Sequence, residues 1–196
     1  MSKTFSEWYD FFMRPLEKGR FKKIRKQLLE EANGKVLEIG SGTGVNFPYY
    51  REVEVTAIEP SEFMIRRSLK RKNQANVPIK VVQTGAEKLP FADNSFDTVV
   101  ATLVYCTIPN VDQALLEMRR VCKQNGKILM FEHVKMEQPL LAKLQKALTP
   151  FWKKVCDGCC LDRDTYQLVK SYGLTVVDLK KYYRSLFISM TLKNEK

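Results

Sequence analysis

The chain has 196 residues, with 33 lysines and arginines against 22 aspartates and glutamates, and its formal net charge is +11 at pH 7. This length fits one domain with a substantial core and leaves no room for a separate substrate domain. No apolar stretch approaches the roughly 20 residues of a membrane span, and the first residues do not read as a secretory signal, so we expect a cytoplasmic protein.

Two helices are predicted before the first strand, over residues 5–13 and 17–32, with Pro15 between them. The first contains five aromatic residues, and the second has apolar residues along one face. We expect residues 1–33 to form a helical lid above a ligand site, with Tyr9 facing a substrate, and residues 34–196 to form the main domain.

The positive charge is concentrated in two stretches, with seven basic residues within residues 14–26 and five within 66–72. Such a charge is compatible with nucleic acid, an anionic membrane or an acidic substrate as a partner. Solvated helix faces explain both stretches equally well, and no RNA-binding signature accompanies them. The sequence therefore disfavours nucleic acid and leaves peripheral contact with an anionic membrane open.

A short apolar run then ends in three alternating glycines, Gly40, Gly42 and Gly44. This pattern predicts a buried strand followed by a tight turn whose backbone lies against a bulky ligand. Glu38 lies at the end of that strand, where a buried carboxylate needs donors such as an ammonium group or bound water. A second strand ends at Glu59, nineteen residues after Gly40, which is close to the interval at which Rossmann-type folds place a carboxylate on ribose hydroxyls.

Two cofactors are compatible with these features, a dinucleotide and S-adenosylmethionine. The dinucleotide fingerprint is G-x-G-x-x-G, whereas this chain has G-x-G-x-G preceded by an acid. The segment from Glu38 to Gly44 resembles the first motif of the class I S-adenosylmethionine-dependent methyltransferases. The resemblance implies S-adenosylmethionine as cofactor and S-adenosylhomocysteine as product.

The next helix is predicted to begin after Ser61, a suitable N-cap, and Met64 then faces either the ribose and adenine or the core. A third strand covers residues 79–83. The segment 85–97 resembles the A-E-x-L-P-F-x-x-x-S-F-D segment of small-molecule methyltransferases. That resemblance implies that the backbone of Ala86 faces the adenine, while Glu87 either joins the site or caps a turn. Gly85 stands where many relatives carry an acid.

The remaining pattern alternates strands and helices and predicts parallel βαβ units. Strands are expected over residues 98–104 and 127–133, helices over 111–121, 140–152 and 165–172, and paired closing strands over 174–179 and 185–192. This pattern indicates an α/β fold. The resemblance to the class I methyltransferases implies the rest: a Rossmann-like, doubly wound and mostly parallel seven-stranded sheet with an antiparallel last strand and helices on both faces.

Ligands of such sheets bind at the carboxyl ends of the strands, so we place Thr102 and Leu103 at the cofactor and Tyr105 and Cys106 at the substrate. His133, at the end of the fifth strand, is a candidate general base, or it only hydrogen-bonds a loop. Cys106 and Cys159 are interpreted as pocket lining. The predicted cofactor-binding residues are Glu38, Gly40, Ser41, Gly42, Gly44, Glu59, Pro60, Met64, Gly85, Ala86, Glu87, Thr102 and Leu103.

Three further segments, residues 102–107, 131–134 and 157–159, resemble the methyltransferase-like group that includes animal thiol S-methyltransferases. Quinone and phospholipid methyltransferases share the first motif and the A-E-x-L-P-F segment. Together these resemblances imply methyl transfer to a small or lipid-like acceptor through a thiol, hydroxyl or amine. The hydrophobic N-terminal anchor of the thiol methyltransferases has no counterpart here, so membrane residence is not carried over.

Two alternatives remain, an RNA methyltransferase and a non-catalytic protein that binds S-adenosylmethionine. Against the first, the stretch after the fourth strand lacks the N/D-P-P-Y/F tetrad of many amino-methylating nucleic-acid enzymes. The five cysteines are an odd number and indicate a reducing compartment. Cys156 and Cys159 form a C-x-x-C pair, but with no second pair and a single histidine in the chain we expect no metal site.

Overall fold

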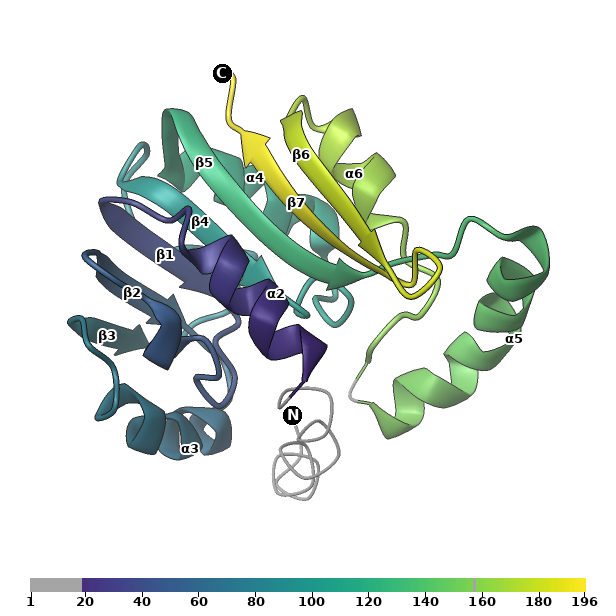
Figure 1. Ribbon diagram of the computed structural model, residues 1–196, viewed down its shortest axis with the longest axis horizontal. Helices are drawn as coiled ribbons and strands as arrows, with labels where there is room; N and C mark the ends of the chain where they lie inside the picture. Colours follow the sequence, from purple (N-terminus) through teal and green to yellow (C-terminus); the bar gives the residue numbers. More distant parts are fainter. Residues whose placement is uncertain (1–18, 157) are drawn as a thin grey trace.

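The computed structural model describes residues 19–156 and 158–196 and shows one twisted sheet of seven strands (Figure 1). The strands lie in the order β3-β2-β1-β4-β5-β7-β6, and β7 runs antiparallel to both of its neighbours. This confirms the predicted Rossmann-like sheet with its antiparallel last strand. The strands are β1 (Lys35–Ile39), β2 (Glu54–Ile58), β3 (Ile79–Val82), β4 (Phe96–Thr102), β5 (Cys122–His133), β6 (Thr175–Tyr182) and β7 (Phe187–Lys193).

Helices and loops cover both faces of the sheet, so that alternate strand residues enter two separate cores. Leu37 and Val99 point into the core beneath α4 and α6, whereas Val36 and Val100 point into the core beneath α2. The described helices are α2 (Arg20–Leu29), the short 3₁₀ helix η1 (Phe47–Tyr49), α3 (Glu62–Lys72), α4 (Val111–Val121), α5 (Pro139–Val155) and α6 (Thr165–Ser171).

Local sequence signals explain where the helices begin. Ser61 accepts a hydrogen bond from the backbone of Met64, which confirms the predicted N-cap of α3. Asn110 and Asp164 cap α4 and α6 in the same way. The strand predicted to begin at residue 127 begins at Cys122 instead, because the pairing of β4 with β5 shifts register after Cys122 instead of ending.

Helix α2 lies across the front of the sheet in Figure 1 and buries Phe21, Ile24 and Leu28 in the core on that face. The ring of Phe21 packs edge-on against Phe131 of β5 and Phe187 of β7. The predicted boundary between residues 33 and 34 therefore does not separate a lid from the domain, because α2 is part of the domain's core. The helix predicted over residues 5–13 and Tyr9 lie outside the described residues.

Helix α5 has an unusual burial pattern. It lies to one side of the sheet in Figure 1 and buries two polar residues, Gln145 and Thr149. Its large apolar side chains are instead exposed, with accessible fractions from 40% to 78%: Leu140, Leu144, Leu148, Phe151, Trp152 and Val155. None of the helices within residues 19–156 and 158–196 combines the length and apolar character needed to cross a bilayer.

Candidate cofactor and acceptor site

The turn after β1 is built on three glycines with positive φ, 63° at Gly40, 53° at Gly42 and 75° at Gly44. A Cβ on Gly40 would overlap the side chain of Val104, and a Cβ on Gly44 would lie 2.6 Å from the ring of Phe47. A Cβ on Gly42 would meet nothing within 4 Å. Two glycines thus allow close packing, and the third borders open space.

The hydroxyl of Ser41 adds a second sign that a ligand belongs at this turn. The residue is buried, and its Oγ has no hydrogen-bond partner among the described residues. Buried polar atoms are normally paired, so an unpaired one in a functional motif calls for a partner from outside the chain. Open space over Gly42 and the unpaired Ser41 hydroxyl both fit a bound nucleoside with polar groups.

Glu59, at the end of β2, is fixed by this turn. Its carboxylate accepts hydrogen bonds from the backbone N–H of Gly42 at 3.0 Å and of Ser61 at 2.9 Å. These contacts hold the side chain at the carboxyl edge of the sheet, beside the glycine turn. The predicted contact with ribose hydroxyls stays a prediction that this position supports.

Glu38, at the end of β1, meets two donors from the protein itself, and its expected contact with an ammonium group or water stays a prediction. Its two carboxylate oxygens accept hydrogen bonds from Asn46 Nδ2 and Tyr50 Oη, both at 2.9 Å. Burial raises the pKa of Glu38 from 4.5 to about 7, although these two hydrogen bonds and the charge of Arg25 act in the opposite direction. Burial and the neighbouring Glu38 also raise the pKa of Tyr50.

Arg25 of α2 joins this buried network to the end of β4. Its guanidinium donates to Asn46 Oδ1 at 3.0 Å and to Thr102 Oγ1 at 2.6 Å. Neither Arg25, Asn46 nor Tyr50 was identified from the sequence, because their approach to Glu38 depends on how α2 and η1 pack. In the sequence, Arg25 is one of the seven basic residues within residues 14–26, and that stretch indicated only a solvated helix face.

The chain bends sharply where β4 ends. Leu103 has a φ of 54°, which is uncommon for a bulky residue, and its N–H donates to the carbonyl of Phe131 at 2.7 Å. The next two N–H groups, of Val104 and Tyr105, both donate to Oε1 of Glu132. Such backbone strain is found often at ligand sites, and the position agrees with the predicted cofactor contact of Thr102 and Leu103.

Tyr105 packs in the core against α4. Its side chain is fully buried, and its hydroxyl contacts the carbonyl of Ala114 and the sulfur of Met118, both on α4. Its predicted contact with the substrate stays a prediction. Met64 and Ala86 are also buried, Pro60 is exposed, and Gly85 and Glu87 are half-buried, so cofactor contact by these five stays a prediction.

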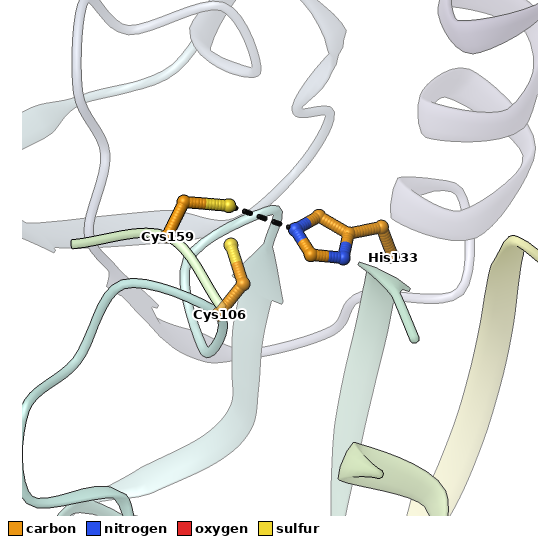
Figure 2. Close-up of side chains that lie close together, drawn as sticks. All are labelled: Cys106, His133 and Cys159. Carbon is orange, nitrogen blue, oxygen red and sulfur yellow. Dashed lines mark hydrogen bonds between the residues drawn. The ribbon is translucent and has the colours of Figure 1, made fainter. Parts of the chain in front are cut away.

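Cys106, His133 and Cys159 come together from three parts of the chain (Figure 2). His133 Nε2 lies 3.0 Å from Cys159 Sγ, and the ligand atoms of all three residues lie within 4.8 Å of one another. All three side chains are buried. A hydrogen bond from Cys106 lowers the pKa of the Cys159 thiol, with His133 acting in the same direction, whereas that bond and burial raise the pKa of Cys106. The sequence showed Cys159 only as half of a C-x-x-C pair, because these contacts span up to 53 residues.

Glu132 lies beside this cluster and was also missed as a functional residue. Burial raises its pKa from 4.5 to about 7, against the two backbone hydrogen bonds from Val104 and Tyr105. Its second oxygen, Oε2, is buried without a partner among the described residues.

A separate hollow opens at the amino ends of the strands and is lined by Gly34, Glu52, Asn76 and Asp97 among others. This edge of the sheet is opposite to the one at which α/β sheets bind ligands.

The fold and the glycine turn together define a class of protein, the Rossmann-like enzymes that bind S-adenosylmethionine. A family model described as "Methyltransferase domain" matches residues 37–130. A structure of a SAM-dependent methyltransferase from Thermotoga maritima superposes with a TM-score of 0.71 over 97% of this chain and 98% of that one. Its 20% sequence identity supports the fold alone.

Sequence relatives make the assignment more specific. Phosphatidylethanolamine N-methyltransferase of Cereibacter sphaeroides is 31% identical over 156 residues, which cover 77% of this chain and 76% of that protein. Thiol S-methyltransferase TMT1B of Homo sapiens is 33% identical over 160 residues. These residues cover 78% of this chain and 66% of that protein, so the chain spans just under two thirds of the length of TMT1B. The chain belongs to the class I S-adenosylmethionine-dependent methyltransferases, and its cofactor is S-adenosylmethionine.

Proposed function

We propose that this chain transfers the methyl group of S-adenosylmethionine to a small or lipid-like acceptor. The observation that carries the proposal is the turn after β1, where open space over Gly42, the unpaired hydroxyl of Ser41 and the fixed carboxylate of Glu59 lie together. The thiol and phospholipid methyltransferases to which the chain is similar support a small or lipid-like acceptor.

The cofactor supplies a methyl group already activated by its sulfonium, so the protein has to position two molecules and exclude water. In this proposal Gly42, Ser41 and Glu59 bind the nucleoside, and the network around Glu38 holds the strand ends rigid. The bend at Leu103 and the side chain of Cys106 border the acceptor. The general-base role of His133 stays a prediction, and its Nε2 already faces Cys159.

Isothermal calorimetry tests the cofactor part of the proposal. Glu59→Gln should weaken binding of S-adenosylhomocysteine by about 1–3 kcal/mol, the usual cost of disturbing a hydrogen bond to a charged group. Glu62→Gln is the matched control, because Glu62 is an exposed residue of α3 whose carboxylate forms an ion pair with Arg66. Equal loss in both variants, or tighter binding of a nicotinamide dinucleotide, would contradict the proposal.

A mass-spectrometric screen for methylated products tests the reaction itself. The wild-type protein is incubated with S-adenosylmethionine and a panel of thiols, phenols, amines and phospholipids. We expect methylation of at least one class, with a thiol as the first candidate. Binding of the cofactor without any methylated product would favour the non-catalytic alternative, and methylation of added RNA alone would favour the RNA methyltransferase.

We also propose that α5 lies on an anionic lipid surface. Its exposed apolar side chains are accompanied by four exposed lysines, Lys143, Lys146, Lys153 and Lys154. A helix with an apolar face and flanking positive charge binds in the interfacial plane of a membrane. A lipid surface fits this combination better than an apolar protein groove, because the lysines complement anionic headgroups. The cytoplasmic location stays a prediction.

Vesicle sedimentation tests the membrane contact. The wild-type protein should bind vesicles that contain phosphatidylglycerol, bind phosphatidylcholine vesicles less well, and dissociate as salt rises. The double change Leu144→Glu and Phe151→Glu should weaken binding at least about 10-fold, since each buried apolar side chain contributes about 1.5–3 kcal/mol. Leu116→Glu on α4 is the control, because that side chain is also exposed, at 47%, but lies outside α5. Unchanged vesicle binding by the double variant, or a dimer that this variant dissociates, would overturn the proposal.

A further inference from the structure

Three soft ligand atoms meet in one buried space at the carboxyl edge of the sheet. Cys106 follows β4, His133 is the last residue of β5, and Cys159 lies in the loop after α5. Figure 2 shows the two sulfurs and the imidazole facing one another. Their ligand atoms lie within 4.8 Å of one another, and the closest pair, His133 Nε2 and Cys159 Sγ, is 3.0 Å apart.

We propose that Cys106, His133 and Cys159 bind a zinc ion that holds the sulfur of a thiol acceptor in its fourth position. The site itself follows from the geometry of these residues. The acceptor part rests on the proposed methyl transfer. This proposal replaces the expectation of no metal site, which considered the C-x-x-C pair and the single histidine but not the approach of Cys106.

The distances suit tetrahedral zinc after small side-chain movements. With Zn–S bonds of about 2.3 Å and Zn–N bonds of about 2.0 Å, tetrahedral ligands lie roughly 3.5–3.8 Å apart. The distance of 3.0 Å between His133 Nε2 and Cys159 Sγ would increase slightly. Any two ligand atoms near the 4.8 Å limit would move closer together. Two thiolates and an imidazole form a soft set that selects zinc over magnesium or calcium. Three protein ligands leave the one open position that catalytic zinc sites keep.

Two polar atoms beside the cluster are left without protein partners. Glu132 Oε2 and His133 Nδ1 are both buried without hydrogen-bond partners among the described residues. The guanidinium of Arg163 contacts Cys160 Sγ at 3.5 Å and donates to the carbonyls of Tyr105 and Ile108. A Zn²⁺ ion bound by two thiolates and a neutral imidazole would carry no net charge, so its burial with these ligands needs no counter-charge.

The zinc would change how the acceptor loses its proton. A thiol that binds the open position releases its proton to solvent and remains as a metal-bound thiolate. The acceptor sulfur then attacks the methyl carbon, the bond from that carbon to the sulfonium sulfur breaks, and its electron pair stays on the cofactor. The products are a methyl thioether and S-adenosylhomocysteine. His133 acts in this scheme as a ligand and no separate base is required.

Cobalt substitution tests the site independently of activity. Fully reduced, chelator-treated protein is titrated with Co²⁺, and near-ultraviolet absorption from sulfur-to-cobalt charge transfer is recorded. We expect one ion per chain, and at least about 10²-fold weaker binding in Cys159→Ser and His133→Ala, since even outer contacts of a metal site change affinity 10–100-fold. Cys156→Ser is the control, because Cys156 lies three residues from Cys159 but outside the cluster. No metal uptake by wild type, or the same spectrum in Cys159→Ser, overturns the site.

A second measurement avoids the risk that a variant does not fold. Zinc added to the wild-type protein should slow iodoacetamide labelling of Cys106 and Cys159 and leave Cys156 unchanged, as peptide mass spectrometry would show. Equal labelling of Cys106 and Cys159 with and without zinc overturns the site.

Thiophenol and phenol then test the acceptor position. We expect thiophenol, but not phenol, to change the absorption spectrum of the cobalt-loaded wild-type protein. If neither compound changes the spectrum, the claim that the metal binds the acceptor sulfur is overturned. If no thiol is methylated under any condition, the proposed function fails for thiols while the spectra still decide the metal site. If thiols are methylated at the same kcat/KM after zinc removal, only the zinc inference fails.

Discussion

Substitutions at two glycines of the turn after β1 should distinguish a loss of packing from a loss of ligand binding. Gly40 and Gly42 both have positive φ, so alanine strains both positions similarly. Only Gly40 has a protein side chain, Val104, in the path of a new Cβ. We predict that Gly40→Ala lowers the melting temperature more than Gly42→Ala, whereas Gly42→Ala, in folded protein, weakens cofactor binding about 10-fold or more. Thermal denaturation and calorimetry on both variants check this, and equal effects on stability would show that Val104 moves aside.

The buried carboxylate of Glu38 makes stability depend on pH. Its pKa is raised from 4.5 to about 7, so between these values the folded chain keeps a proton that the unfolded chain has lost. Stability contributed by this group is therefore complete below about pH 4.5, falls as pH rises to about 7, and is constant above that value. We predict that Glu38→Gln reduces the loss of unfolding free energy between pH 5 and pH 8 by about 1–3 kcal/mol. This range follows because a shift of one pKa unit corresponds to about 1.36 kcal/mol.

Urea denaturation at both pH values measures the difference. Glu54→Gln is a suitable control, because Glu54 is an exposed residue at the start of β2. If the wild type and Glu38→Gln lose the same stability between pH 5 and pH 8, the carboxylate is ionised in the folded protein throughout this range.

At the scale of elements, α2 determines how much of the N-terminus can be removed. Its buried Phe21, Ile24, Arg25 and Leu28 complete one core and the network around Glu38. We predict that deletion of residues 1–18 leaves a folded protein, whereas deletion of residues 1–30 prevents stable folding. Far-ultraviolet circular dichroism with thermal melting distinguishes the two outcomes. If the shorter deletion also loses turnover at unchanged stability, the predicted lid is supported.

The sequence predicted most elements because their signals are local. The alternating runs, the N-cap at Ser61 and the glycine turn predicted the parallel part of the sheet and a ligand at its edge, whereas the closing antiparallel strand and the identity of the cofactor came from the resemblance to class I methyltransferases. The cluster of Cys106, His133 and Cys159 and the network of Arg25, Asn46 and Tyr50 could not be predicted, because residues far apart in the chain meet only after packing. The contact of the Tyr105 hydroxyl with α4 was not foreseen for a similar reason, since it follows the positive φ at Leu103.

At the scale of the whole molecule, cofactor binding should appear as added stability. A ligand at 100 times its dissociation constant stabilises the folded state by about 2.7 kcal/mol. For a chain of this size each kcal/mol raises the melting temperature by about 2–4 °C, so we predict an increase of roughly 5–11 °C. S-adenosylhomocysteine at 100 times its dissociation constant should produce this shift, and NAD at the same concentration should produce none. A shift with NAD alone would contradict the assigned cofactor class.

The strand order also determines when the sheet can close during synthesis. β6 contacts the rest of the sheet through β7, which lies between β5 and β6 although it is the last of the seven described strands to leave the ribosome. Until Phe187–Lys193 emerge, residues 127–133 of β5, which pair with β7, present an open hydrogen-bonding edge with an apolar surface. Asn194, whose side chain donates to the carbonyls of Arg119, Cys122 and Lys123, then joins the end of α4 to the start of β5. Folding of this part of the sheet is thus completed only after β7 has been made, and nascent chains halted before β7 would be the form most exposed to aggregation and to chaperones.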